Sequence, residues 1–159
     1  DLNITADTLN NTGAVNTQQL TKAQLKKLNN QGSLISDKFE LSTLDSLNNS
    51  GKLISNQDLE LNTAALTNTQ NSILAGNSNL NLHINGADFN NQGVISAVGS
   101  LVLDAAQINT VNNGSLSAGN QLNIDTQMDS YSFFICKKSE KEKILELSRK
   151  LSFPIEDAF

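Results

Sequence analysis

The residues that could do chemistry are few in this chain of 159 residues. His83 is the single histidine, and no cysteine lies near it to complete a metal site. Cys136 is the single cysteine, so it cannot form a disulfide within the chain. Because no histidine follows in the sequence to activate it, we interpret Cys136 as a packed thiol rather than a nucleophile. We therefore expect no catalytic residue, no metal site and no cofactor.

Carboxylates are the remaining candidates for chemistry. Paired carboxylates on one face of a protein can hold calcium or hydrolyse glycosidic bonds. Five aspartates recur along the chain, at Asp37, Asp45, Asp58, Asp88 and Asp104. Their distances from the repeated glycines described below differ from one aspartate to the next. We therefore expect separate, solvated acids rather than a paired site.

The composition excludes several classes of partner. The formal net charge is −5, and residues 1–127 contain 10 acids and 5 bases, so no basic face is expected for nucleic acid or acidic lipid. No apolar run approaches the roughly 20 residues that a membrane helix needs, so we expect no membrane insertion. The sequence begins in mid-pattern without methionine, and we interpret it as a fragment of a longer protein.

The segments that carry these side chains form a sequence repeat. The string "LNNxG" occurs three times, and the variants "FNNQG" and "VNNG" continue it at about one or two times a 20-residue period. The glycines are Gly13, Gly32, Gly51, Gly93 and Gly114. Asparagine pairs precede these glycines, at Asn10 and Asn11, Asn29 and Asn30, Asn48 and Asn49, Asn90 and Asn91, and Asn112 and Asn113. We predict that each glycine turns a corner that needs positive φ, with Asn71 in the glycine position of a degenerate unit. Stacked asparagines are expected to form a ladder of amide hydrogen bonds.

Apolar residues follow the same period in three positions of each unit. An "LxL" motif begins at Leu2, Phe39, Leu59, Leu80, Leu101 and Leu122, with Leu20 expected at the unclear place between Leu2 and Phe39. A second position precedes the asparagine pairs, at Leu9, Leu28, Leu47, Leu66, Phe89 and either Ile108 or Val111. A third lies two residues after the glycine position, at Val15, Leu34, Leu53, Ile73, Ile95 and Leu116.

A fixed period of this length indicates a stacked architecture. Within each unit the apolar and polar residues alternate, which is strand spacing. The sequence predicts an all-β fold, a right-handed parallel β-helix of about six to seven coils, with the hand assigned by analogy. At about 4.8 Å per coil, the stack would be about 30 Å long. A leucine-rich repeat fits less well, and residues 20–28 could alternatively form a helical turn that leaves one coil.

The repeated signature resembles the filamentous haemagglutinin repeats of large secreted bacterial adhesins and of contact-dependent growth inhibition exoproteins. Its five glycine-anchored copies, in phase with the "LxL" motifs, cover residues 1–126. The resemblance implies a parallel β-helix, export through an outer-membrane transporter of the two-partner type, and a place on the bacterial surface. It also implies contact with a receptor or glycan on a host or neighbouring cell, and a role in virulence.

The tail from 127 to 159 has a different composition, without asparagine or glycine. "YSFFIC" could form a short strand, and a capping box at Ser139 and Glu142 predicts a helix that ends before Pro154. Three interpretations stay open for this segment. It could cap the β-helix, begin a fused module such as a growth-inhibition toxin, or derive from a frameshift or gene rearrangement.

The sequence therefore favours a non-enzymatic stalk or adhesion segment of a large secreted surface exoprotein. The alternatives are a β-helix enzyme acting on polysaccharides, the junction of a toxin module, and a cytosolic immunity-like protein.

Overall fold

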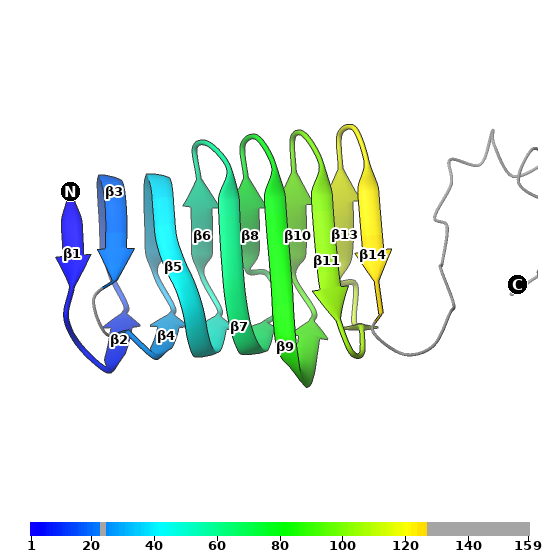
Figure 1. Ribbon diagram of the computed structural model, residues 1–159, viewed down its shortest axis with the longest axis horizontal. Helices are drawn as coiled ribbons and strands as arrows, with labels where there is room; N and C mark the ends of the chain where they lie inside the picture. The colour runs from blue at the N-terminus through cyan, green and yellow to red at the C-terminus, as the bar shows by residue number, and fades with distance from the viewer. Residues whose placement is uncertain (23–24, 127–159) are drawn as a thin grey trace, which may run out of the picture.

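The computed structural model describes residues 1–22 and 25–126, and these residues form strands joined by short turns. The strands stack side by side from the N-terminus onwards, so that the chain winds through successive coils along one axis (Figure 1). Their bounds are β1 Leu2–Ile4, β2 Thr8–Asn11, β3 Ala14–Lys22, β4 Lys27–Asn30, β5 Ser33–Asn49, β6 Lys52–Ser55, β7 Leu59–Asn68, β8 Ile73–Gly76, β9 Leu80–Asn91, β10 Val94–Ala97, β11 Leu101–Ala105, β12 Asn109–Thr110, β13 Ser115–Ala118 and β14 Leu122–Asp125.

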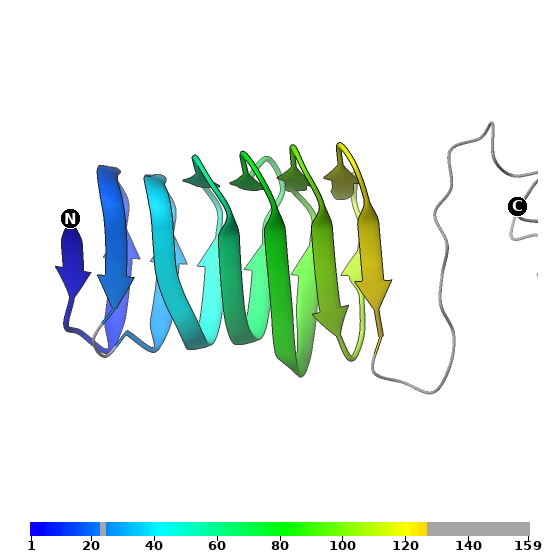
Figure 2. The same ribbon diagram turned by 45° about the horizontal axis from the view of Figure 1, so that its top comes forward.

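All of the strand pairs in the described residues are parallel, and each strand pairs with its equivalent in a neighbouring coil, on both sides within the stack and on one side at its ends. The turned view separates the strand layers that face each other across the bore (Figure 2). This arrangement confirms the predicted parallel β-helix. The described residues contain no helix, so the helical alternative for residues 20–28 finds no support in the described part of that segment. The predicted tail helix lies outside the described residues.

Columns of apolar side chains fill the bore, and the strand register defines the members of the three columns that the sequence predicts. The second apolar residues of the "LxL" motifs, among them Leu61, Leu82 and Leu103, form a further buried column. The first of the three predicted columns contains Leu2, Leu20, Phe39, Leu59, Leu80, Leu101 and Leu122, which confirms the place of Leu20. The second contains Leu9, Leu28, Leu47, Leu66, Phe89 and Ile108. Inner members of both columns are at most 5% exposed, because the coils above and below cover them. The register thus selects Ile108 over Val111, which is 40% exposed.

The third column differs from the sequence prediction at one coil. Its members are Val15, Leu34, Leu53, Leu74, Ile95 and Leu116, so Leu74 takes the position that was predicted for Ile73. Leu74 is 0% exposed, whereas Ile73 is half-buried on the outer face. The turn that includes Thr69–Gln70–Asn71 is longer by two residues than the "LNNxG" spacing, because Asn49 to Lys52 spans three positions and the equivalent Asn68 to Ile73 spans five.

The shifted register gives a direct test at neighbouring positions. Leu74→Ala should lower the free energy of unfolding by about 2–5 kcal/mol, because it opens a cavity in the bore. Ile73→Ala should cost less than half as much, because this side chain lies on the half-exposed face. Urea unfolding of both variants measures the difference. A larger loss for Ile73→Ala would contradict the assignment of Leu74 to the bore.

Candidate functional site

The most regular polar feature is a buried ladder of asparagine amides at one corner of the coil. Nδ2 of Asn11, Asn30 and Asn49 each donates to Oδ1 of the next asparagine at 2.8 Å, and Nδ2 of Asn68 donates to Asn91 at 3.0 Å. The same amides also donate to main-chain carbonyls of Ser33, Lys52, Ile73, Val94 and Ser115. Each buried amide therefore joins two coils, and its donors point towards the C-terminal end.

A second ladder lies one residue earlier, on the outer surface. Asn29 donates to Asn10 at 2.8 Å, and Asn48 donates to Asn29 at 2.9 Å. Thr67 interrupts this column, which resumes where Asn109 donates to Asn90 at 2.9 Å. The outer amides donate towards the N-terminal end, opposite to the inner ladder.

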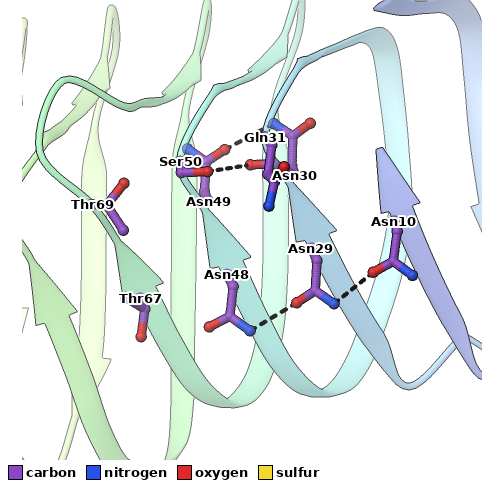
Figure 3. A pocket seen from close by; sticks show the side chains of 9 residues that line it. All are labelled: Asn10, Asn29, Asn30, Gln31, Asn48, Asn49, Ser50, Thr67 and Thr69. Atoms are coloured by element: carbon purple, nitrogen blue, oxygen red, sulfur yellow. Dashed lines mark hydrogen bonds between the residues drawn. The ribbon is translucent and has the colours of Figure 1, made fainter. Parts of the chain in front are cut away.

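The two ladders and the turn residues that follow them line a shallow groove with a volume of about 290 Å³. Figure 3 shows the outer amides as one row along the stack and Gln31, Ser50 and Thr69 as a second row. The lining residues are Asn10, Asn29, Asn30, Gln31, Asn48, Asn49, Ser50, Thr67 and Thr69, and none of them carries a charge. The groove lining is therefore uncharged, and its hydrogen-bonding groups are those of the outer amides and the turn side chains.

The corner glycines do not have the backbone conformation that the sequence predicted. None of the glycines in the described residues has positive φ, so the predicted left-handed corner is wrong. The reason for glycine is instead the close approach of successive coils. A Cβ on Gly32 would lie 2.0 Å from the carbonyl oxygen of Gly13, and one on Gly51 would lie 2.0 Å from that of Gly32. At Gly93 and Gly114 the nearest oxygens would be 2.5 Å and 2.4 Å away.

Among residues 1–22 and 25–126, positive φ occurs instead at asparagines, with values of 65° at Asn71, 52° at Asn112 and 69° at Asn113. Asn71 does not occupy the glycine column, because the strand register places Ser72 there. Asn112 and Asn113 lie in the turn between the ladder positions and Gly114, so they do not extend the ladders as their sequence suggested. Asn109 and Thr110 hold the two ladder positions in that coil. Thr110 thus ends the inner ladder, and its buried Oγ1 has no hydrogen-bond partner in the described part of the chain.

The candidate chemical groups lie away from the groove. His83 Nδ1 lies 3.6 Å from Oδ2 of Asp104 on the outer face of the sheet. Asp104 is also in register with Asp125. The sequence comparison missed this pair, because Asp125 was not among the five aspartates that it compared. Those five occupy different columns, since Asp88 is in register with Ala65 and Asp104 with His83. Nowhere in residues 1–22 and 25–126 do three or more metal-ligating side chains gather.

Hydrogen bonds from a neighbouring turn lower the pKa of the Asp58 carboxylate. The backbone N–H of Asn79 donates to its carboxylate at 2.9 Å, and this bond is the largest cause that lowers the pKa of Asp58. The side chains of Ser78 and Asn79 lower it further. Asp58 is exposed, so we interpret it as a support for the turn before β9 rather than a catalytic acid.

Family comparison agrees with this architecture. The model of the haemagglutinin repeat family matches residues 1–42, 36–82 and 73–127. The chain belongs to the haemagglutinin repeat family. The apolar columns, the corners and the amide ladders all lie within the residues that this family model matches. No curated protein and no solved structure matches the chain.

A second family model, described as a domain of unknown function (DUF6630), matches residues 121–159. This match begins just before β14 and continues through the tail. Cys136, the predicted strand and the capping box all lie outside the described residues. Within the described residues, no helix is long and apolar enough to cross a membrane.

The close approach at the glycines makes a prediction with a matched control. Gly32→Ala should destabilise the haemagglutinin repeats by about 1–3 kcal/mol, because its Cβ collides with a fixed carbonyl. Gly13→Ala should change stability by about 0.5 kcal/mol or less, because no atom lies within 4 Å of the added Cβ. Thermal and urea unfolding measure both. Equal losses at the two positions would refute the steric explanation.

The buried inner ladder should contribute more to the free energy of unfolding than the exposed outer ladder. Asn49→Ala should cost about 2–4 kcal/mol, because it removes three hydrogen bonds from a buried site: those that Asn49 accepts from Asn30 and donates to Asn68 and to the Ile73 carbonyl. Asn48→Ala should cost about 0.5 kcal/mol or less, because water can replace its exposed hydrogen bond. The free energy of unfolding in urea is the measurement. A loss at Asn48 that matched the loss at Asn49 would show that burial does not set the difference.

Proposed function

We propose that the chain is a structural, non-enzymatic stalk and contact segment of a large secreted bacterial surface exoprotein. The observation that carries this proposal is the haemagglutinin repeat match over residues 1–127, combined with continuous stacking of the coils. Main-chain hydrogen bonds and the inner amide ladder join each coil to the next. Such a stack holds a distal segment at a fixed distance from the cell.

Contact would take place at the groove along the asparagine corner. Its rows repeat with the coils, so one coil offers a few hydrogen bonds and several coils offer the same bonds in sequence. Weak binding per coil then gains strength through multivalency. The partner class is a receptor or glycan on a host or neighbouring cell, and the absence of charge in the groove lining favours a neutral, hydroxylated surface.

Export would use an outer-membrane transporter of the two-partner type, which places the segment on the bacterial cell surface. The haemagglutinin repeat family supports this route and a role in virulence. A growth-inhibition exoprotein is the narrower version of the proposal. The change of family model near residue 121 supports it, because such a protein joins a repeat stalk to a different C-terminal module.

The rival function is a β-helix enzyme that acts on polysaccharides. Asp104 and Asp125 supply stacked carboxylates, but both lie outside the groove, whose lining is uncharged. No observation joins those acids to a concave surface that could hold a sugar chain. The structural role therefore accounts better for the described residues.

Binding to cells tests the contact role. The purified full chain should sediment with intact bacterial or animal cells, and Asn48→Asp should weaken the apparent affinity roughly tenfold, about 1.4 kcal/mol, by adding a charge to the groove. Val98→Asp adds the same charge at a position that is 67% exposed and outside the groove, so it should bind as the original chain does.

Two results would count against the contact role: no sedimentation of the original chain with any cell type, or equal losses in both variants. The export route is tested separately by cell fractionation after disruption of the transporter gene. Export that continued unchanged would contradict the two-partner route.

A further inference from the structure

One outer face of the stack carries apolar side chains. It is formed by β6, β8, β10 and β13, which lie side by side behind β7, β9 and β11, and it continues over the first residues of β5 and β3 (Figure 1). The strand register places the outward side chains of this face in two columns. The corner column, next to the asparagine corner, includes Lys52, Ile73 and Val94, and the middle column includes Ile35, Ile54, Ala75 and Ser96.

A continuous apolar patch lies on this face, and it consists of Ile35, Ile54, Ile73, Ala75 and Val94. Ile54 is in register with Ile35 on one side and with Ala75 on the other. Ile73 is in register with Val94 in the same way. Val94 is 39% exposed, and the other four side chains are half-buried. None of the five fills the bore, so their apolar character indicates a surface that another molecule covers.

The charged groups of the stack lie at the edges of this face or on other faces. The outer face of β9, β11 and β14 carries His83, Asp104 and Asp125 in one column. Within the corner and middle columns, Lys52 is the single charged residue. Asp37 lies at the opposite edge of the same face, where its carboxylate accepts a hydrogen bond from Nδ2 of Asn56 at 2.8 Å. The face therefore has a basic edge and an acidic edge, with apolar side chains between them.

A second copy of the stack matches this face in spacing. Its columns repeat at the same strand spacing of about 4.8 Å, so each outward side chain meets one side chain of the other copy. When two stacks lie parallel, with a two-fold axis along the middle columns, Ile35, Ile54 and Ala75 each face their own copies. The same-residue contacts that fill the bore are thereby repeated between two stacks.

The charges select the parallel direction. In the parallel pair, the corner column of one stack faces the edge with Asp37 of the other, so Lys52 approaches a carboxylate. A reversed stack centred on the patch places Lys52 against its own copy, against Ile73 or against Val94. Each of these neighbours leaves the ammonium group without a counter-charge, and covering an unpaired charge costs free energy. The parallel pair is therefore favoured.

We propose that two copies of the chain pair side by side through this face, with their stacks parallel and their middle columns in contact. The interface is isologous, because the two-fold axis brings the same residues together from both copies. The patch spans about four coils and the width of a short strand, roughly 20 Å by 15 Å, or about 300 Å² per copy. A stable dimer usually buries about 800 Å² per partner, so the pairing of this chain is weak.

The parallel direction has a consequence for a surface stalk. Stalks that project from one cell run in the same direction, so this face would join neighbouring stalks into bundles. Each further coil with the same columns would add its own weak contacts. The pairing itself does not depend on binding to another cell, because the residues that line the asparagine groove belong to other columns.

Sedimentation velocity of the full chain tests the pairing. The original chain should change from monomer to dimer as its concentration rises towards about 1 mM. Ile54→Asp should weaken the dimer roughly tenfold or more, because the two added charges face each other on the two-fold axis. Ser46→Asp is the matched control, since Ser46 is a half-buried residue in register with Lys27 and Ala65, outside the two columns. This control should leave the dimer unchanged.

Cross-linking tests the direction of the stacks. In the background of Cys136→Ser, Ser96→Cys places one thiol in the middle column, opposite its own copy in the parallel pair. A short bismaleimide, which can bridge sheets packed about 10 Å apart, should then give a covalent dimer. Ser46→Cys in the same background should stay monomeric. In a reversed pair centred on the patch, the two Ser96 positions lie on different coils, out of reach of the reagent.

Either measurement can overturn the proposal. A monomer at every concentration would do so, as would equal weakening by Ile54→Asp and Ser46→Asp. Equal cross-linking of Ser96→Cys and Ser46→Cys would refute the parallel contact. A monomer that bound neutral phosphatidylcholine vesicles, and lost this binding in Ile54→Asp, would assign the face to a lipid surface and not to a second copy.

Discussion

Hydrogen bonding between equivalent positions of successive coils, one strand spacing apart, is the interaction on which the rest of this structure depends. It brings each side chain against the side chain at the same position of the next coil. A residue type is then favoured when it packs against or bonds to a copy of itself. Leucine satisfies this in the bore and asparagine satisfies it at the corner. Like charges do not, which explains why acids are sparse and why, in the described residues, only Asp104 and Asp125 lie in register with each other.

The same self-pairing explains how much the sequence could predict. The "LxL" column and the column before the asparagine pairs were visible because the same residue types return at nearly constant intervals. The predictions were wrong where a turn changed length without changing composition. The sequence suggested Asn71 as a substitute for the repeated glycine, although it lies in a turn one residue before the glycine column. The predicted member of the third apolar column was therefore Ile73 instead of Leu74. Only strand pairing shows which residue the adjacent coil accepts.

The corner shows two other limits of the sequence. The repeated glycine suggested that the turn requires positive φ. The structure shows instead that a side chain there would collide with the carbonyl oxygen of the neighbouring coil. Conformational preferences within one coil do not reveal that contact. Asn112 and Asn113 resembled a ladder pair, although they lie in a turn with positive φ while Asn109 and Thr110 hold the ladder positions. The ladders themselves were predictable from stacked asparagines. The groove was not, because it depends on two rows of side chains meeting across a corner.

The opposite directions of the two amide ladders have an electrostatic consequence. Aligned amide dipoles add along an axis, as peptide dipoles do in a helix, and a long row of them would build partial charges at its ends. Here the inner row donates towards the C-terminal end and the outer row towards the N-terminal end. Their dipoles oppose each other wherever both rows are present. A stack built this way can lengthen by whole coils without accumulating a field at its tips.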